Sequence, residues 1–186
     1  MTDGIQFLLI DQPQQLDRYF SSLVRLLELS IDDDAILGIN QTLSDEAVEY
    51  YRSDLKKQIE AGTLKLMIAV NENEEVILNC LFKGSIQNTT KHIFDLQKGF
   101  IHPQYRHTGL LPKAMLFIAK TAKAQGVDVL TLDVRDGTPA HKLWKRVGFK
   151  TFGIMDDYSR YEGKSYHGHY MSMTTDALFE QFKKTA

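Results

Sequence analysis

IHPQYRHTGLLP, residues 101–112, is the stretch around which the rest of the chain is organised. The residues before it, 92–101, are typical of a strand, and those after it, 112–125, are typical of a helix that ends at Gly126. A Gly-containing turn between a strand and a helix directs unpaired backbone N–H groups at one point, where the helix dipole favours an anion. Arg106 adds a positive charge that can fork onto phosphate oxygens. The stretch therefore predicts a phosphate site, with an ordinary turn as the alternative.

The overall composition bounds the function. The 186 residues are 43% hydrophobic and 25% charged, which predicts a single globular domain over residues 1–186. A formal net charge of −2 gives no general attraction to nucleic acid or to an anionic membrane. A lone cysteine, Cys80, excludes an intramolecular disulfide and suits a reducing compartment. No apolar run is long enough for a signal peptide or a membrane span, so we expect a cytoplasmic protein.

The order of predicted elements indicates an α/β fold with a mixed sheet. Strands are expected at 5–10, 64–70, 76–84, 92–101, 127–135, 149–155 and 167–174. Helices are expected at 16–27, 44–60, 112–125 and 139–147, with a short one after 175. Thr42 and Asp45 resemble a capping box at the start of the second helix. Helix 112–125 would cross between two parallel strands, and helices would cover both faces of the sheet.

Two motifs separated by the buried strand 127–135 carry a family resemblance. Residues 106–111, RHTGLL, follow the pattern Gln/Arg-x-x-Gly-x-Gly/Ala, with a His-Pro-x-Tyr lead-in at 102–105. Residues 140–149, AHKLWKRVGF, follow the pattern Ala-x-x-Leu-Tyr-x-x-x-Gly-Phe. In this order, the segment from 92 to 173 resembles the GNAT superfamily of acetyl-CoA-dependent N-acetyltransferases. The resemblance implies the GNAT-like fold, acetyl-CoA as cosubstrate and no metal.

The resemblance also implies which residues hold the coenzyme. Strand 92–101 would splay from strand 127–135, and the pantetheine arm would pair with backbone in the gap, where Gly99 is consistent with a bulge or a close approach. A backbone N–H there would supply the oxyanion contact. The residues implied to bind coenzyme are Phe100, Ile101, His102, Arg106, His107, Thr108, Gly109, Leu110, Leu111, Ala140 and Trp144.

The chain departs from the family pattern at two places. Leu111 stands where a small residue usually lets the pyrophosphate approach, and Pro112 follows it, so the helix is expected to begin at Pro112. Trp144 stands where many members have a Tyr that acts as general acid. An indole N–H is no acid near neutral pH, so that role is absent or held elsewhere.

The resemblance to the GNAT superfamily also implies candidate catalytic groups. Asp95 is the first choice for the base, directly or through a water, with a surface carboxylate or an ion-pair partner as the alternative. Tyr158 is the first choice of proton donor to the leaving thiolate. The alternative donors are Tyr161, Tyr166 and Tyr170, and for each of the four tyrosines a packing or rim position is the alternative to a catalytic role. His92 is expected to be an ordinary polar residue on the other strand face.

Other side chains invite hypotheses that the spacing does not favour. Cys80, within an apolar strand, is expected to be a core thiol. No zinc-type spacing relates the histidines, so no metal is predicted. The acidic residues at 32–34 and 156–157 would either attract a cationic amine or remain solvated.

The sequence therefore predicts a transferase that moves an acetyl group from acetyl-CoA to a primary amine by direct attack. A small-molecule amine is the expected acceptor, with a protein N-terminus or lysine as the alternative. Exposed strand edges near the C-terminus and the habit of the superfamily favour a homodimer. The rival interpretation is a non-catalytic acyl-CoA-binding sensor or interaction module, which Leu111, Pro112 and Trp144 keep open. A phosphate site for some other nucleotide is not favoured, because the chain has neither a Walker-type Gly-Lys-Ser/Thr nor a Rossmann-type Gly cluster.

Overall fold

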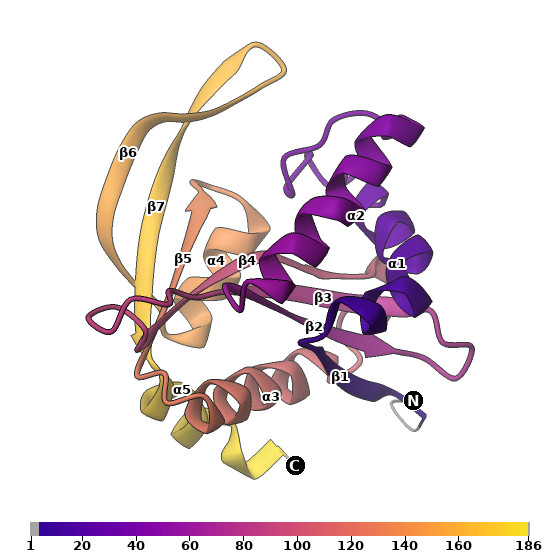
Figure 1. Ribbon diagram of the computed structural model, residues 1–186. Coiled ribbons are helices and arrows are strands. Elements are labelled where there is room, and N and C mark those ends of the chain that lie inside the picture. Colours follow the sequence, from indigo (N-terminus) through magenta and orange to yellow (C-terminus); the bar gives the residue numbers. More distant parts are fainter. Residues whose placement is uncertain (1–3, 186) are drawn as a thin grey trace.

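A mixed sheet runs through the protein, and its strand order is β1-β2-β3-β4-β5-β7-β6 (Figure 1). The computed structural model describes residues 4–185. Neighbouring strands are antiparallel except β4 and β5, which are parallel and joined by a helix, as predicted. The strands are β1 (Gln6–Ile10), β2 (Leu64–Val70), β3 (Val76–Lys83), β4 (Ile93–Ile101), β5 (Val129–Arg135), β6 (Lys150–Tyr161) and β7 (Lys164–Thr174).

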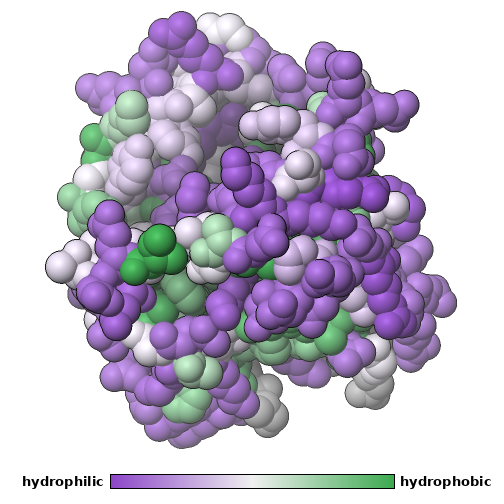
Figure 2. Space-filling view, in the orientation of Figure 1, coloured by the Kyte–Doolittle hydropathy of each residue, from purple (hydrophilic) through white to green (hydrophobic). Residues whose placement is uncertain are grey.

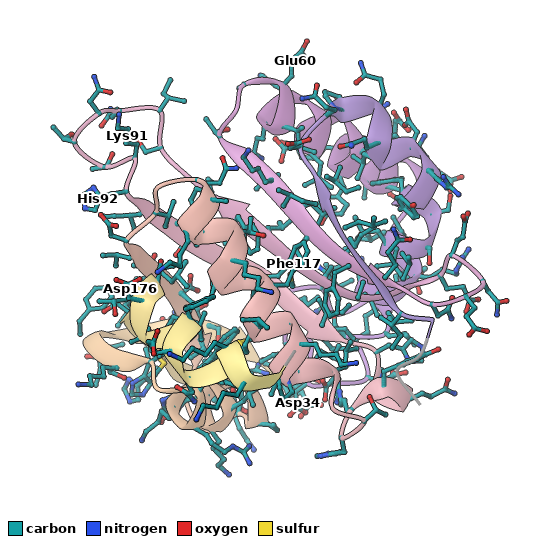
Figure 3. The ribbon with its side chains drawn as sticks, turned by 90° about the horizontal axis from the view of Figure 1, so that it is seen from below. Asp34, Glu60, Lys91, His92, Phe117 and Asp176 are labelled. Atoms are coloured by element: carbon teal, nitrogen blue, oxygen red, sulfur yellow. The ribbon has the colours of Figure 1, made fainter. Side chains whose placement is uncertain are left out.

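Helices cover both faces of the sheet and divide the core into two layers. One layer lies under α1 (Pro13–Glu28) and α2 (Asp45–Glu60), with Leu16, Phe20 and Leu66 fully buried. The other lies under α3 (Leu110–Ala124), α4 (Pro139–Val147) and α5 (Thr175–Phe182). Figure 3 shows α3 and α5 side by side across this second face. Short 3-10 turns lie at Pro103–Tyr105 and Lys183–Thr185.

The second helix begins two residues later than the capping-box prediction implies. Ser44 is the N-cap of α2, and its side chain accepts a hydrogen bond from the backbone N–H of Ala47. Asp45 and Glu46 then occupy the first turn, where the helix dipole favours negative charge. Thr42 lies before the helix, so the predicted role of Thr42 was wrong.

The third helix begins two residues earlier than predicted. Gly109, with a φ of 87°, is the N-cap, and α3 starts at Leu110 rather than at Pro112. Pro112 is therefore the third helical residue, where its missing N–H belongs to the first turn and needs no partner within the helix. The helical state of Leu111, although disfavoured before a proline, accompanies partial burial of Leu111 against the core.

The last two strands form one long hairpin instead of a strand pair with a long connection. β6 and β7 pair from Lys150↔Ser172 to Tyr161↔Lys164, and the turn at Glu162 and Gly163 joins them. The segment 156–166 lacks the apolar alternation that marks a half-buried strand, so its pairing was missed. Along this hairpin the register shifts between Met155 and Ser159.

Among residues 4–185, no helix is both long enough and apolar enough to cross a membrane.

Candidate active site

The two parallel strands pair over a short distance and then separate. β4 and β5 are in register only at Ile93↔Val129, Phe94↔Leu130 and Asp95↔Thr131. Past Asp95, β4 continues to Ile101 and β5 to Arg135 without a shared register among the described residues. The splay expected from the family resemblance is therefore present. It leaves the edge of β4 that faces β5 free to pair with an extended ligand.

A β-bulge shapes the free part of β4. Asn79 is opposite Phe100 and Leu81 is opposite Gln97, so Lys98 and Gly99 together face the single residue Cys80. Lys98 has a φ of 53°, and its carbonyl accepts a hydrogen bond of 2.8 Å from the Asn79 side chain. A bulge bends its strand and re-aims backbone groups. The bulge expected at Gly99 is thus confirmed, and it lies in the gap between β4 and β5.

The turn before α3 presents exposed N–H groups. His107, Thr108 and Gly109 are exposed, and within the described residues their backbone N–H groups donate no hydrogen bond. Only the Thr108 hydroxyl is engaged, donating to the Tyr105 carbonyl at 2.7 Å. A β-carbon added at Gly109 would meet no atom within 4 Å. The N-terminus of α3 therefore has the open, donor-rich geometry that suits a phosphate.

Arg106 points back toward the sheet and the α1–α2 loop, residues 29–44. Its Nε donates to the Ile101 carbonyl at 3.1 Å, and its Nη2 lies 2.7 Å from Asp33 Oδ2. The guanidinium also lies 5.1 Å from the centre of the Phe100 ring. Arg106 thus ties the loop to the end of β4. A phosphate would have to share the guanidinium with Asp33 or replace that carboxylate.

The other residues predicted to bind coenzyme lie in the same region, and most of them are packed against the core rather than exposed. Leu111 and Ala140 pack against the core layer below α3 and α4. The indole of Trp144 lies 3.6 Å from where a Gly99 β-carbon would be, so α4 places it beside the bulge. Phe100 is buried. The backbone N–H of His102 already donates to the Ile77 carbonyl at 2.9 Å, so it has no free N–H to offer.

Asp95 lies where the two strands part. Its Oδ1 accepts a hydrogen bond of 2.8 Å from the Thr131 hydroxyl on β5. Its Oδ2 accepts one of 2.8 Å from the Gln97 side chain, two residues along β4. These two donors hold the partly buried carboxylate at the closed end of the gap. Asp95 is therefore a positioned group rather than a freely solvated surface carboxylate.

A carboxylate–phenol pair lies farther along the gap. The Tyr158 hydroxyl donates a hydrogen bond to the carboxylate of Asp133, which is exposed on β5. Burial, and then this hydrogen bond, raises the pKa of Tyr158 above its ordinary range. A β-carbon at Gly168 would lie 2.2 Å from Tyr158 Cγ, so β7 needs glycine where the ring packs. Asp133 was missed from the sequence, where its only signal is one carboxylate within an apolar strand.

The α1–α2 loop and the β6–β7 hairpin meet over the end of β5. Arg135, 8% exposed, donates to the Asp34 carbonyl at 2.6 Å, and its guanidinium lies 5.2 and 5.1 Å from the centres of the Tyr161 and Tyr166 rings. Lys98 donates to the Leu37 carbonyl of the same loop. Figure 2 shows the surface hollowed between the hairpin and the segment leading to α2, with hydrophilic residues around the rim.

Three of the acidic residues that the sequence singled out, Asp33, Asp156 and Asp157, have side-chain partners within the protein. Asp33 pairs with Arg106, Asp157 with Arg160, and Asp156 with His167, whose Nδ1 is 2.9 Å from Asp156 Oδ1. Asp133, which the sequence did not single out, is paired with Tyr158.

Cys80 is buried in β3, as predicted, and burial raises the pKa of the thiol to about 12. A thiol held neutral in this way is a poor nucleophile, which agrees with its expected place in the core. His92 precedes β4 and contributes its carbonyl, which accepts hydrogen bonds from the N–H groups of Asp128 and Val129 at 2.9 and 3.1 Å.

Solved structures share this fold across most of their length. An acetyltransferase of the GNAT family from Streptococcus pneumoniae has a TM-score of 0.68 and 20% identity, covering 91% of this chain and 99% of its own. A ribosomal-protein-alanine N-acetyltransferase from Brucella melitensis has a TM-score of 0.70 and 14% identity, with 91% and 98% covered. A protein from Salmonella typhimurium, assigned as an acetyltransferase and solved with its cofactor acetyl-CoA, has a TM-score of 0.69 and 14% identity, with 94% and 95% covered.

These likenesses, at 20% identity or less, establish the fold: the chain has the fold of the GNAT acetyltransferases. No protein-family model and no curated protein sequence matches the chain.

Proposed function

We propose that this protein is an N-acetyltransferase that transfers an acetyl group from acetyl-CoA to a primary amine by direct attack. The observation that carries the proposal is the separation of β4 from β5 beyond Asp95, with a bulge in the gap and an open helix N-terminus next to it. Together these features offer an extended ligand one strand edge and its phosphate end a set of N–H donors.

The coenzyme is proposed to lie along this path. Its pyrophosphate would contact the N–H groups from His107 to Gly109, and its pantetheine arm would pair with the free edge of β4. The acetyl carbonyl would then reach the bulge at Lys98 and Gly99, where a backbone N–H would polarise it. Trp144, close to Gly99, would pack against the arm near the thioester.

In the proposed reaction, the amine nitrogen attacks the carbonyl carbon, the C–N bond forms and the C–S bond breaks. The proton lost by the amine passes to a carboxylate, directly or through a water. Asp95, held by Thr131 and Gln97 at the closed end of the gap, is the predicted base. Asp133, nearer the open end, would bind the ammonium form of the incoming acceptor. Holding both reactants in the gap supplies much of the rate.

The leaving thiolate needs a hydrogen-bond donor. Tyr158 stays the predicted one, but its hydroxyl is engaged with Asp133 and its pKa is raised. A phenol with a raised pKa is a weaker acid, so hydrogen-bond donation to the thiolate is favoured over full proton transfer. Because a phenol has a single proton, this hydroxyl would orient Asp133 while the acceptor binds and would turn to the thiolate only when the C–S bond breaks.

A small-molecule amine is the proposed acceptor. The α1–α2 loop contacts Arg135 and Lys98 across the gap and narrows the approach to it, which suits a small substrate. The Brucella melitensis neighbour is named for a ribosomal-protein alanine, so a protein N-terminus remains the second candidate. A lysine side chain is the third.

A homodimer is proposed from the edge of the sheet. β6 is the last strand, and Phe152 and Ile154 on it are 65% and 63% exposed. Apolar side chains on an unpaired edge favour pairing with a second chain. Light scattering on the wild type and on Phe152→Asp tests this: the wild type is expected to be a dimer and the variant a monomer, and a monomeric wild type contradicts it.

Acetyl-CoA binding is the first test of the proposed function. Acetyl-CoA at about one hundred times its dissociation constant should raise the free energy of unfolding by roughly 2.7 kcal/mol, seen as a thermal shift. Arg106→Ala should weaken the shift. Asp33→Asn is the matched control, because it breaks the same ion pair but leaves the guanidinium free for phosphate. No wild-type shift at millimolar acetyl-CoA contradicts the proposed function.

An amine screen that follows released thiol separates the enzyme from the rival, a non-catalytic acyl-CoA sensor. Turnover with some amine, reduced by Asp95→Asn, supports the enzyme. A thermal shift without turnover on any amine or peptide N-terminus supports the sensor.

A further inference from the structure

Three side chains that are scattered in the sequence meet beside the end of β5. Asp136 follows β5 directly, His141 lies in the first turns of α4, and His169 lies on β7, the neighbour of β5 in the sheet (Figure 1). Their ligand atoms all lie within 4.8 Å of one another. None of the three takes part in the proposed acetyl transfer.

Both imidazoles contact the same oxygen of the Asp136 carboxylate. His141 Nδ1 and His169 Nε2 each lie 3.1 Å from Asp136 Oδ1. The two imidazole rings stack with their centres 4.0 Å apart and their planes at 26°. Ligands of a tetrahedral metal ion with bonds near 2.0–2.1 Å are separated by roughly 3.3 Å. A metal ion lies close to the plane of each imidazole that binds it, so binding by all three groups requires the exposed Asp136 carboxylate to rotate outward and the two stacked rings to tilt toward the ion.

Fixed backbone and side-chain contacts hold each group in place. The N–H of Asp136 donates to the His167 carbonyl at 2.9 Å, and the Thr138 hydroxyl accepts from the N–H of His141 at 3.1 Å. His169 Nδ1 lies 3.1 Å from the Thr151 hydroxyl, which orients the ring and leaves Nε2 facing Asp136. Metal-binding histidines commonly have such a partner on the second ring nitrogen.

We propose that Asp136, His141 and His169 form a binding site for one divalent transition-metal ion, best matched by Zn²⁺. Two imidazoles and a carboxylate are ligands that Zn²⁺ accepts, and a water completes the tetrahedron. The side chains of His141 and His169 are 8% and 16% exposed, whereas that of Asp136 is 48% exposed. The ion would enter past Asp136, and the fourth position would face solvent.

The expected affinity for Zn²⁺ depends on the hydrogen bonding of His141. Its Nε2 is buried and has no hydrogen-bond partner among the described residues. Coordination through Nδ1 requires the proton on Nε2, where no acceptor stabilises it. The loss of such an outer partner typically weakens metal binding 10–100-fold, so we expect micromolar rather than nanomolar affinity.

A bound ion would join three elements that pack around the gap between β4 and β5. It would connect the turn after β5, the start of α4 and the middle of β7. Because it binds the folded arrangement and not the separated ligands, it would stabilise the protein in proportion to its concentration.

Calorimetric titration of the chelator-treated full chain with Zn²⁺ tests the site, with Co²⁺ absorption as a second readout. The expected result is one Zn²⁺ per chain with micromolar affinity, and a visible Co²⁺ spectrum typical of tetrahedral N/O ligands. Asp136→Asn and His169→Ala should each weaken binding at least tenfold. Asp136→Asn is the safer variant for folding, because the side chain is exposed and keeps its shape.

His167→Ala is the matched control. His167 lies two residues from His169 on β7, is 59% exposed and pairs with Asp156 outside the site. This variant should bind Zn²⁺ as the wild type does. Absence of stoichiometric binding in the wild type overturns the proposal, as does binding that Asp136→Asn and His169→Ala leave unchanged or that His167→Ala removes. Circular dichroism of each variant confirms that a loss of binding is not a loss of fold.

Discussion

The substitution Gly109→Ala tests whether the turn before α3 contacts the coenzyme pyrophosphate. A matched control at the other end of the helix accounts for the backbone strain that the substitution adds. Gly109 has a φ of 87°, a left-handed conformation that costs an L-residue roughly 1–2 kcal/mol. No atom lies within 4 Å of the added methyl group, so the free energy of unfolding should fall by about that amount and no more. The methyl would instead occupy the open space that the pyrophosphate is proposed to enter.

Gly126→Ala is the matched control for this substitution. Gly126 lies just beyond the other end of α3, has a φ of 70° and likewise has no atom within 4 Å of a β-carbon. The backbone cost should be similar, but no coenzyme is proposed to bind there. The two variants should therefore lose comparable stability in urea, and only Gly109→Ala should lose affinity for acetyl-CoA.

Chemical denaturation with and without acetyl-CoA measures both effects of the substitution at Gly109. At about one hundred times the wild-type dissociation constant, the coenzyme should stabilise the wild type and Gly126→Ala by roughly 2.7 kcal/mol. A hundredfold loss of affinity would leave Gly109→Ala with about 0.4 kcal/mol of stabilisation. Equal stabilisation of all three proteins would refute the reasoning, because it would place the pyrophosphate away from the turn.

Three further predictions test the Tyr158–Asp133 pair, the core thiol and the second helix. Tyr158→Phe removes the hydrogen bond to Asp133, so kcat/KM for a cationic amine should fall while the acetyl-CoA thermal shift persists; an unchanged kcat/KM contradicts this role. Because burial raises the Cys80 pKa to about 12 from 9.0, the stability from the neutral thiol is complete below pH 9 and lost as pH rises toward 12. A thiol reagent below pH 9 should therefore modify Cys80 only after unfolding, and rapid reaction of the folded protein would be the contrary result. Ser44→Ala should lower the free energy of unfolding by about 1 kcal/mol, and Thr42→Ala should change it little; urea denaturation would contradict this if the order were reversed.

Local patterns were read well where they depend on a few neighbouring residues. The strand Leu64–Val70 was predicted with its observed ends because an apolar run interrupted only by Lys65, with a turn on each side, defines it. The parallel pairing of β4 and β5 followed from the helix between them. The bulge was expected from Gly99, and the turn before α3 from Gly109.

Boundaries were less accurate where two local preferences compete. Leu111 precedes a proline, which disfavours helix, yet its side chain packs on the core and the helix includes it. The far half of the β6–β7 hairpin is polar, so no apolar alternation predicted these strands. The turn at Gly163, at the tip of the hairpin, was the one local signal of it.

The sequence by itself determined the order of the elements, the turn that presents N–H groups before α3 and the fold that these imply, because each follows from short-range sterics and apolar periodicity. Tertiary structure decided which distant side chains meet. Arg106 is paired with Asp33, Tyr158 donates to Asp133, and the cluster at Asp136 joins residues of a turn, a helix and a strand. Such meetings depend on how strands are ordered in the sheet and where a bulge turns a side chain, and no spacing along the chain encodes them.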